Sequence, residues 1–257
     1  MESAPLSLQW PLRESEALFA GGVDLYTRAG PIDLLRLVPS PSPRATVHAQ
    51  LKRPPAAASP WLDLRDAEFG NDPFPHVVAP EAIRGELADK LASVLASDLR
   101  WTENDGGFYS ALECDLRAVG SNSAAAALFA PAALSSLEVQ ASAIFNTPLR
   151  LVGAIAGHRL DVGRGIGLHT DRPSEDAETH RILFTICDPL SPDAGGHFLL
   201  ADGPRGEDVR GIIPLRHNTA IAFALTAFSH HGVTIMRAGV RFSVVFSFAR
   251  APELAAT

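Results

Sequence analysis

Three side chains in the C-terminal half of this sequence could bind a metal ion through nitrogen and oxygen. The stretch "GIGLHTDRP" contains His169 and Asp171, and the stretch "SHHGVTIM" contains His230 and His231. On a β-strand, residues i and i+2 project from the same face, so the imidazole of His169 and the carboxylate of Asp171 would point together. One further histidine, either of the adjacent pair, would complete two imidazoles and a carboxylate. This set suits non-haem Fe(II) with open coordination positions.

A second candidate set lies on the last strand-like run, "RFSVVFSF". Its Phe and Val residues alternate with more polar ones, so one face must be core and Arg241 and Ser243 must point to the other side. An inward-facing arginine is unfavourable unless it meets an anion. A guanidinium with a neighbouring hydroxyl matches a carboxylate well. The sequence offers no obvious acidic partner on a neighbouring strand, so we expect a bound small carboxylate.

The secondary structure expected to position these residues changes along the chain, from mainly helical before Pro148 to β-strands after it. After Pro148, about eight short apolar runs are separated by Gly, Pro and Asp, a pattern typical of a β-sandwich or barrel. Before it, "FPHVV" predicts a short strand, and helical periodicity follows Pro80. A second helical region is broken or kinked at Pro131. We therefore expect a domain at 61–257 in which residues 61–148 give helical support to a barrel at 149–250.

Residues 1–60 have a different texture. Closely spaced prolines in "LVPSPSPR" and "LKRPPAAASP" favour extended linker over packed structure, and "PIDLLRLV", which leads into the first of them, could be a short helix or strand. Two roles stay open for this extension. It could wrap on the main domain, or it could serve as a docking arm for a partner or carrier protein.

Composition excludes several classes of function. A net charge of −7 argues against nucleic acid as a partner, because phosphate neutralisation needs a basic excess. The two cysteines, Cys114 and Cys187, form no C-x-x-C pair and indicate a reducing compartment without disulfides. We see no secretory signal and no apolar run long enough to span a bilayer. We expect a cytoplasmic protein with no nucleic-acid or membrane partner; the sequence does not indicate its oligomeric state.

Taken jointly, the His169-Thr170-Asp171 triplet, a later histidine and Arg241 with Ser243 resemble the motif of the iron(II)/2-oxoglutarate-dependent oxygenases. The prolyl-hydroxylase-like branch is the most similar. In that family the arginine follows the third metal ligand by about ten residues, which implies His231 and leaves His230 packed or facing solvent. "GGHFLL" and "FPHVV" also resemble segments of that branch, and the resemblance covers about residues 73–249.

The resemblance implies a fold, a cofactor set and a reaction. The fold is α+β and mainly β: a double-stranded β-helix (a jelly-roll or cupin-like barrel) of about eight strands preceded by helices. Fe(II) would be held by His169, Asp171 and His231, with the far carboxylate of 2-oxoglutarate on Arg241 and Ser243 and with O2 as co-substrate. The enzyme would be a dioxygenase that hydroxylates an unactivated C–H of an amino acid, peptide or small natural-product-type metabolite. Succinate and CO2 would be released.

Departures from the family pattern leave alternatives open. Asp171 stands where the family's halogenases have Gly or Ala, and Ser247 stands where nucleic-acid demethylases have a second arginine. The tyrosine that many prolyl hydroxylases place on the first barrel strand is missing; His158 and Arg159 occur there, so the second contact of the co-substrate is open. The same chemistry could also give desaturation, cyclisation or epimerisation. A non-catalytic metal- and 2-oxoglutarate-binding barrel, acting as a sensor or docking module, is the alternative of another class.

Two segments are predicted to contact a substrate. The polar loop "RPSEDAETHR" could be a lid or a clamp in which Arg172 or Arg181 meets a substrate carboxylate, or it could be a plain solvated connection. "WTENDGGFYSALE" gathers aromatic residues, including Phe108 and Tyr109, that could form the other wall or could simply pack in the core.

Overall fold

The structure is a computed structural model. It describes residues 24–27, 30–33, 51–52, 61–64, 66–97, 99–118, 123–171, 178–188 and 190–251. Arg172 and most of the loop that contains it lie outside these residues. Within the described part of the chain, no helix is long and apolar enough to cross a membrane.

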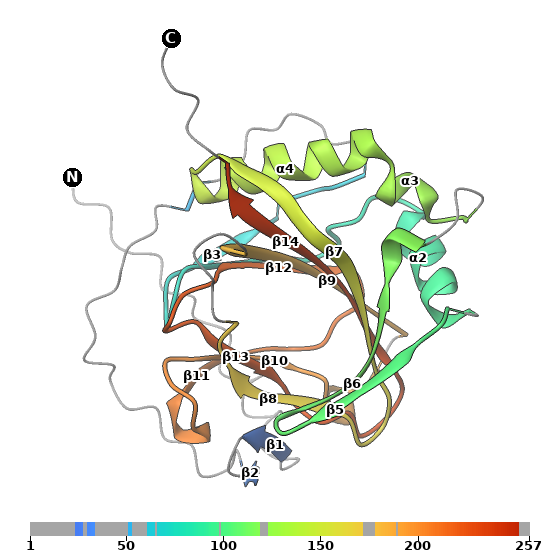
Figure 1. Ribbon diagram of the computed structural model, residues 1–257. Coiled ribbons are helices and arrows are strands. Elements are labelled where there is room, and N and C mark those ends of the chain that lie inside the picture. The colour runs from blue at the N-terminus through green and yellow to red at the C-terminus, as the bar shows by residue number, and fades with distance from the viewer. Residues whose placement is uncertain are drawn as a thin grey trace, which may run out of the picture.

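Twelve strands form one curved antiparallel sheet (Figure 1). The strands before Pro148 are β3 (Glu68–Gly70), β4 (His76–Ala79), β5 (Thr102–Gly106) and β6 (Tyr109–Asp115). The strands after it are β7 (Leu149–Leu160), β8 (Gly165–His169), β9 (His180–Cys187), β10 (Phe198–Ala201), β11 (Val209–Ile213), β12 (Thr219–Ala224), β13 (His230–Val233) and β14 (Arg241–Arg250). Their order across the sheet is β11-β10-β13-β8-β6-β7-β14-β9-β12-β4-β3, with β5 paired to β6.

The sheet curls into the two facing halves of a double-stranded β-helix. In Figure 1, β7, β14, β9 and β12 lie above, and β8, β13, β10 and β11 lie below. Each of the eight apolar runs predicted after Pro148 forms a strand, so the predicted fold class is confirmed. The sheet has more strands than the eight expected, because residues 61–148 add β3 to β6 to it.

Three α-helices are described: α2 (Leu87–Ala96), α3 (Ala126–Phe129) and α4 (Pro131–Phe145). Short 3-10 turns occur at η2 (Leu116–Ala118), η3 (Pro192–Ala194) and η4 (Gly206–Asp208). Pro131 begins α4, where the missing N–H is not needed by the first turn. The helix after Pro80 begins later than its periodicity suggested, because Ile83 forms a β-bridge with Leu62 instead.

Two apolar cores follow from alternation on the strands. On β14, Val244 and Phe246 face the first core, which lies between the sheet and the helices, whereas Val245 faces a second core inside the barrel. In Figure 1, α4 runs along the outer side of β7 and β14. The helices therefore cover the outside of one half of the barrel, and the inner face is left for a site.

Part of the N-terminal extension is described. β1 (Asp24–Thr27) and β2 (Gly30–Asp33) form a two-stranded antiparallel hairpin that lies against β8 (Figure 1). The first residues of "PIDLLRLV" are therefore strand, and the rest of that run lies outside the described residues. Both roles predicted for residues 1–60 stay predictions.

Candidate metal and dicarboxylate site

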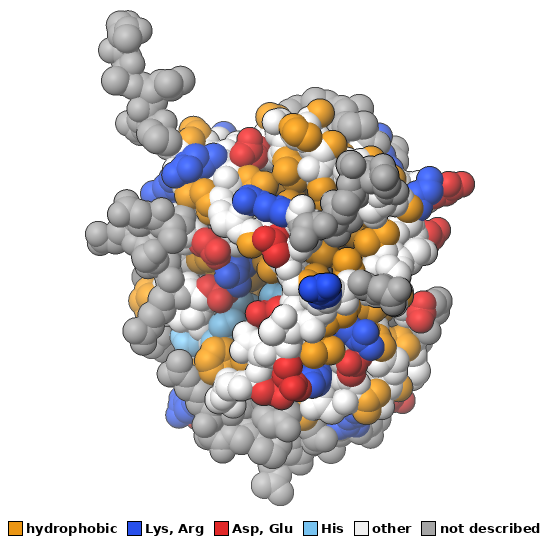
Figure 2. Space-filling view, turned by 45° about the vertical axis from the view of Figure 1, so that its right-hand side comes forward, with side chains coloured by type: hydrophobic (Ala, Val, Ile, Leu, Met, Phe, Trp, Pro, Cys, Tyr) orange, Lys and Arg blue, Asp and Glu red, His pale blue; other side chains and the backbone are white. Residues whose placement is uncertain are grey.

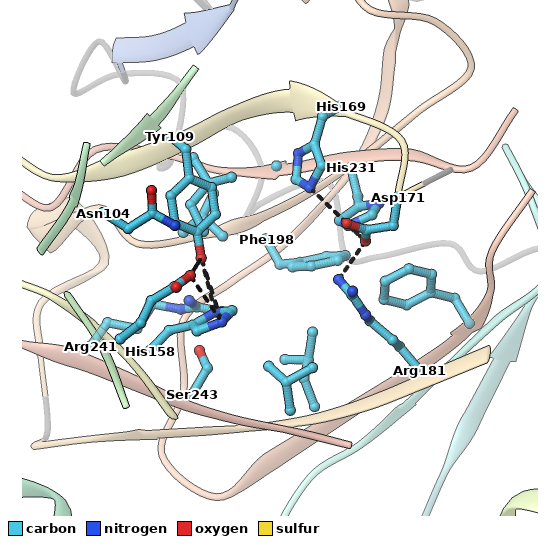
Figure 3. Close-up of a pocket in the computed structure, with 17 residues that line it drawn as sticks. Asn104, Tyr109, His158, His169, Asp171, Arg181, Phe198, His231, Arg241 and Ser243 are labelled. Atoms are coloured by element: carbon cyan, nitrogen blue, oxygen red, sulfur yellow. Dashed lines mark hydrogen bonds and ion pairs between the residues drawn. The ribbon is translucent and has the colours of Figure 1, made fainter. Parts of the chain in front are cut away.

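His169, Asp171 and His231 converge at one end of the barrel interior. His169 ends β8, and His231 is its direct partner on the antiparallel strand β13. Asp171 follows β8, with its Oδ1 3.5 Å from His169 Nε2 and its Oδ2 3.1 Å from His231 Nε2 (Figure 3). One ligand atom from each side chain lies within 4.8 Å of the others. His230, next in the chain, is half-buried and is not among the residues that line the cavity.

Backbone carbonyls orient both imidazoles of this triad. The Nδ1 of His169 donates to the carbonyl oxygen of Gly167, and the Nδ1 of His231 donates to that of Ser229, each at 2.9 Å. Because a carbonyl can only accept, the proton of each neutral ring is on Nδ1 and the lone pair is on Nε2. Both Nε2 atoms face Asp171, so two nitrogen donors and a carboxylate point into one space. Such outer hydrogen bonds are typical of metal-binding histidines.

Aromatic rings pack on both imidazoles, and burial acts on the ionisation of His231 and Asp171. Phe108 stacks on His169 with ring centroids 4.9 Å apart, and Phe198 stacks on His231 at 5.6 Å. Burial lowers the pKa of His231, which favours the neutral, ligating form. Burial also opposes ionisation of Asp171, but the adjacent imidazoles of His169 and His231 and the charge of Arg181 outweigh it and hold the pKa of that carboxyl well below its usual range.

Arg241 and Ser243 lie in the same cavity as the triad, at its other end (Figure 3). Arg241 is only 2% exposed, and burial lowers its pKa to about 10, so it remains a cation at neutral pH. Within the described residues, its Nε and the Oγ of Ser243 are buried without a hydrogen-bond partner, and no carboxylate forms an ion pair with Arg241. An uncompensated buried guanidinium is strongly unfavourable, so this end of the cavity is built for an anion.

The cavity that joins the two ends has a volume of about 230 Å³. Apolar side chains from both halves of the barrel also line it: Ile166, Leu183, Phe198, Phe223, Val233 and Val245. On the face shown in Figure 2, histidine side chains (pale blue) are visible from solvent beside acidic and basic ones.

Three further polar groups line the wall near Arg241. The hydroxyl of Tyr109 donates to Oε1 of Glu113 at 2.6 Å and lies 3.4 Å from Nε2 of His158. His158 on β7 is the strand partner of Glu113 on one side and of Ser243 on the other. Burial lowers the pKa of His158 to about 4 and raises that of Tyr109, so both side chains are uncharged at neutral pH.

The sequence alone indicates no role for Glu113 or Asn104, which both line this wall. His158 stands out only because it occurs on the first barrel strand, where many prolyl hydroxylases have a tyrosine. The available signal was the spacing of Tyr109 and Glu113 along one strand face, since residues i and i+4 of a strand share a side.

The residues predicted to contact a substrate do not all line the cavity. Arg181 on β9 lines it, with Nη1 2.5 Å from Asp171 Oδ2 and Nη2 2.7 Å from Glu178 Oε2. Tyr109 lines the opposite wall, and Phe108 packs on His169. Arg172 lies outside the described residues.

No protein-family model matches the chain, and no curated protein matches its sequence. Solved structures do match. A prolyl hydroxylase from Trichoplax adhaerens, in complex with a hypoxia inducible factor peptide fragment, has a TM-score of 0.55 at 12% identity, covering 68% of this chain and 83% of that one. A prolyl-4-hydroxylase from Pseudomonas putida has a TM-score of 0.54 at 13% identity, covering 69% and 93%.

A third structure is the non-heme alpha ketoglutarate dependent epimerase SnoN from nogalamycin biosynthesis, with a TM-score of 0.50 at 15% identity, covering 68% of this chain and 78% of that one. These likenesses show that this chain shares the fold of the two prolyl hydroxylases and of the epimerase, which agrees with the double-stranded β-helix that the sequence resemblance implied.

Proposed function

We propose that this protein is an Fe(II)- and 2-oxoglutarate-dependent dioxygenase. The observation that carries the proposal is a single cavity with two imidazoles and a carboxylate at one end and an uncompensated buried guanidinium at the other. A metal-binding group alone would need no buried cation. Together, the two ends suit a small dicarboxylate that reaches from a metal ion to Arg241.

The residues at the first end fit Fe(II). His169 and His231 offer unprotonated Nε2 atoms, and Asp171 offers an ionised oxygen, which is the donor set of non-haem iron sites with open positions. When bound there, Fe(II) would supply O2 activation coupled to the oxidative decarboxylation of 2-oxoglutarate to succinate and CO2. The protein supplies ligand orientation through the carbonyls of Gly167 and Ser229.

At the second end, Arg241 and Ser243 would bind the far carboxylate of 2-oxoglutarate. The guanidinium supplies charge, and the Ser243 hydroxyl, which has no partner within the described residues, supplies a hydrogen bond. The second contact left open by the missing tyrosine of the first barrel strand would come from Tyr109. Its hydroxyl arrives from β6 instead and lies beside His158, which occupies the equivalent strand.

The substrate would reach the metal end of the cavity between the β5–β6 hairpin and β9, where Asn104, Tyr109 and Arg181 line the wall. Apolar side chains around the triad exclude water, which protects a reactive centre from side reactions. We propose hydroxylation of a C–H bond in an amino acid, peptide or small metabolite. Desaturation, cyclisation and epimerisation use the same residues and stay alternatives within this proposal.

Succinate formation tests the proposal. The full chain, reconstituted with Fe(II) without oxygen, should convert 2-oxoglutarate to succinate when O2 is admitted, slowly without substrate and faster with a productive one. His169→Ala should abolish this conversion. A wild-type protein that binds iron and 2-oxoglutarate and yet forms no succinate with any amino acid, peptide or metabolite tried would favour the sensor alternative.

A further inference from the structure

Arg181 contacts the carboxylate of the triad rather than open solvent. It is the second residue of β9, where Ile182 and Phe184 face the helix-covered core, so alternation directs Arg181 into the cavity. Its side chain is 21% exposed. Strand pairing on both sides, with Phe223 of β12 and Ser247 of β14, fixes its backbone in the middle of the sheet.

Both terminal nitrogens of this guanidinium have acidic partners. Nη1 donates to Oδ2 of Asp171 at 2.5 Å, and Nη2 donates to Oε2 of Glu178 at 2.7 Å. Glu178 thus binds Nη2, the terminal nitrogen that Asp171 does not bind, and keeps the guanidinium of Arg181 turned toward Asp171. Short charge-assisted bonds of this kind are strong and directional.

The contact distinguishes the two oxygens of Asp171. Oδ2 accepts from Arg181 and lies 3.1 Å from His231 Nε2, whereas Oδ1 lies 3.5 Å from His169 Nε2 and accepts no hydrogen bond from the guanidinium. A carboxylate that bound a metal ion through both oxygens would occupy a coordination position that a chelating keto acid or O2 needs. A site for that chemistry requires a carboxylate restrained to one ligating oxygen.

We propose that Arg181 is a positioning residue that engages one oxygen of Asp171 and so reserves the other for the metal ion. This inference rests on the proposed function. It gives Arg181 a role other than the substrate clamp expected from sequence, because both of its terminal nitrogens are already committed to Asp171 and Glu178. The open positions of the metal then stay available for 2-oxoglutarate and O2.

The experiment separates metal binding from co-substrate chelation. Full-length wild type, Arg181→Leu and Arg181→Lys are loaded with Fe(II) without oxygen, and 2-oxoglutarate is titrated while the absorption of the metal–keto acid chelate is followed. We expect Arg181→Leu to bind Fe(II) roughly 10- to 100-fold more weakly, the range typical when an outer partner of a metal ligand is lost. Once it is saturated with Fe(II), the variant should also bind 2-oxoglutarate more weakly than wild type, because the second oxygen of Asp171 then competes for a coordination position. Arg181→Lys should restore part of the affinity. Its ammonium can donate to one oxygen of Asp171, but it lacks the two terminal nitrogens with which the guanidinium binds Asp171 and Glu178 together.

Arg210→Leu is the matched control. Arg210 is also mostly buried and paired with an aspartate, Asp202, at 3.1 Å, but it lies on β11 and does not line the cavity. Its loss should leave 2-oxoglutarate chelation unchanged. If Arg181→Leu fails to fold by circular dichroism, Arg181→Met, which keeps an unbranched stem without the charged head, takes its place.

Two results would overturn the inference, and they differ from each other. If the Leu or Met variant chelates 2-oxoglutarate as wild type does and only its KM for an organic substrate rises, Arg181 binds substrate. If wild type itself binds neither iron nor 2-oxoglutarate, the proposed function fails and this inference fails with it.

Discussion

His169 and His231 are direct partners across the antiparallel strands β8 and β13, with ring centroids 4.5 Å apart. This pairing brings together two segments that are far apart in sequence and directs both Nε2 atoms at Asp171. Since side chains alternate across a strand, the neighbouring residue His230 cannot share the direction of His231. The register of one strand pair therefore decides which of two adjacent histidines faces the carboxylate.

Alanine at each triad position should remove metal binding. We expect His169→Ala, Asp171→Ala and His231→Ala to lose more affinity for Fe(II) than the roughly 10- to 100-fold that loss of an outer partner costs. His230→Ala is the matched control and should keep most of its iron. Iron content after anaerobic reconstitution measures this, and an iron-free His230→Ala beside an iron-loaded His231→Ala would contradict the assignment.

Arg241→Ala should weaken 2-oxoglutarate binding by about 2–5 kcal/mol, because it removes one partner of a buried charge-assisted pair. The change appears as a raised KM for 2-oxoglutarate. Arg241→Lys should recover only part of this binding free energy, since the point charge of an ammonium replaces a guanidinium that can bind a carboxylate through two nitrogens. Ser243→Ala should cost about 1.5–3 kcal/mol, the value of a hydrogen bond to a charged group.

Iron binding should persist in all three of these variants, because neither residue belongs to the triad. An unchanged KM for 2-oxoglutarate in Arg241→Ala would refute the carboxylate assignment.

Tyr109→Phe and Glu113→Gln should shift the KM for 2-oxoglutarate in opposite directions. The first removes the hydroxyl proposed as the second contact, so KM should rise by the equivalent of about 1.5–3 kcal/mol. The second replaces the carboxylate that accepts the Tyr109 hydroxyl at 2.6 Å by a neutral amide, which binds this hydroxyl less strongly and lowers repulsion of a dicarboxylate. Steady-state kinetics measure both, and an unchanged KM in Tyr109→Phe would exclude Tyr109 as the contact.

Gly195→Ala should destabilise the protein more than Gly163→Ala. Both glycines have positive φ, 77° and 89°, where a Cβ costs about 1–2 kcal/mol. At Gly163 a Cβ would meet nothing within 4 Å, whereas at Gly195 it would lie 1.9 Å from the backbone oxygen of Ile235. Because backbone must move in the second case only, the free energies of unfolding in urea should differ clearly. Equal losses would contradict this packing before β10.

His180 should make the protein less stable in acid. Burial lowers its pKa from 6.5 to about 4, and the charge of Arg250 acts in the same direction. Above pH 6.5 the ring is neutral in both states. Between 6.5 and about 4 only the unfolded chain binds the proton, so the free energy of unfolding falls as pH falls, by up to ~1.4 kcal/mol per pH unit from this group.

The measurement is the slope of unfolding free energy against pH in wild type and in His180→Asn. The slope between pH 6.5 and 4 should be shallower in the variant, whatever the loss of ring packing on Phe145 does to its absolute stability. Identical slopes would show that His180 titrates normally in the folded protein.

Local patterns in the sequence determined much of this molecule. Alternation in "RFSVVFSF" predicted that Arg241 and Ser243 face inward, and the structure buries both beside the cavity. The eight apolar runs after Pro148 predicted eight strands, because short apolar runs bounded by turn residues are typical of strands in a β-sandwich or barrel. The i, i+2 spacing of His169 and Asp171 predicted that the two side chains converge, and they do, although β8 ends at His169 and Asp171 lies in the segment after it.

The tertiary structure alone decided which strands are neighbours and in what register. β5 is fully exposed and carries no apolar alternation, so nothing local distinguished "TENDG" from a loop; pairing with β6 makes it a strand. On its other side β6 pairs with β7, and this second pairing brings Tyr109 and Glu113 to His158. Arg181 meets Asp171 because the curl of the sheet brings the inner face of β9 opposite the end of β8. Such contacts depend on pairing between distant segments, whereas local propensity and alternation act along a single strand.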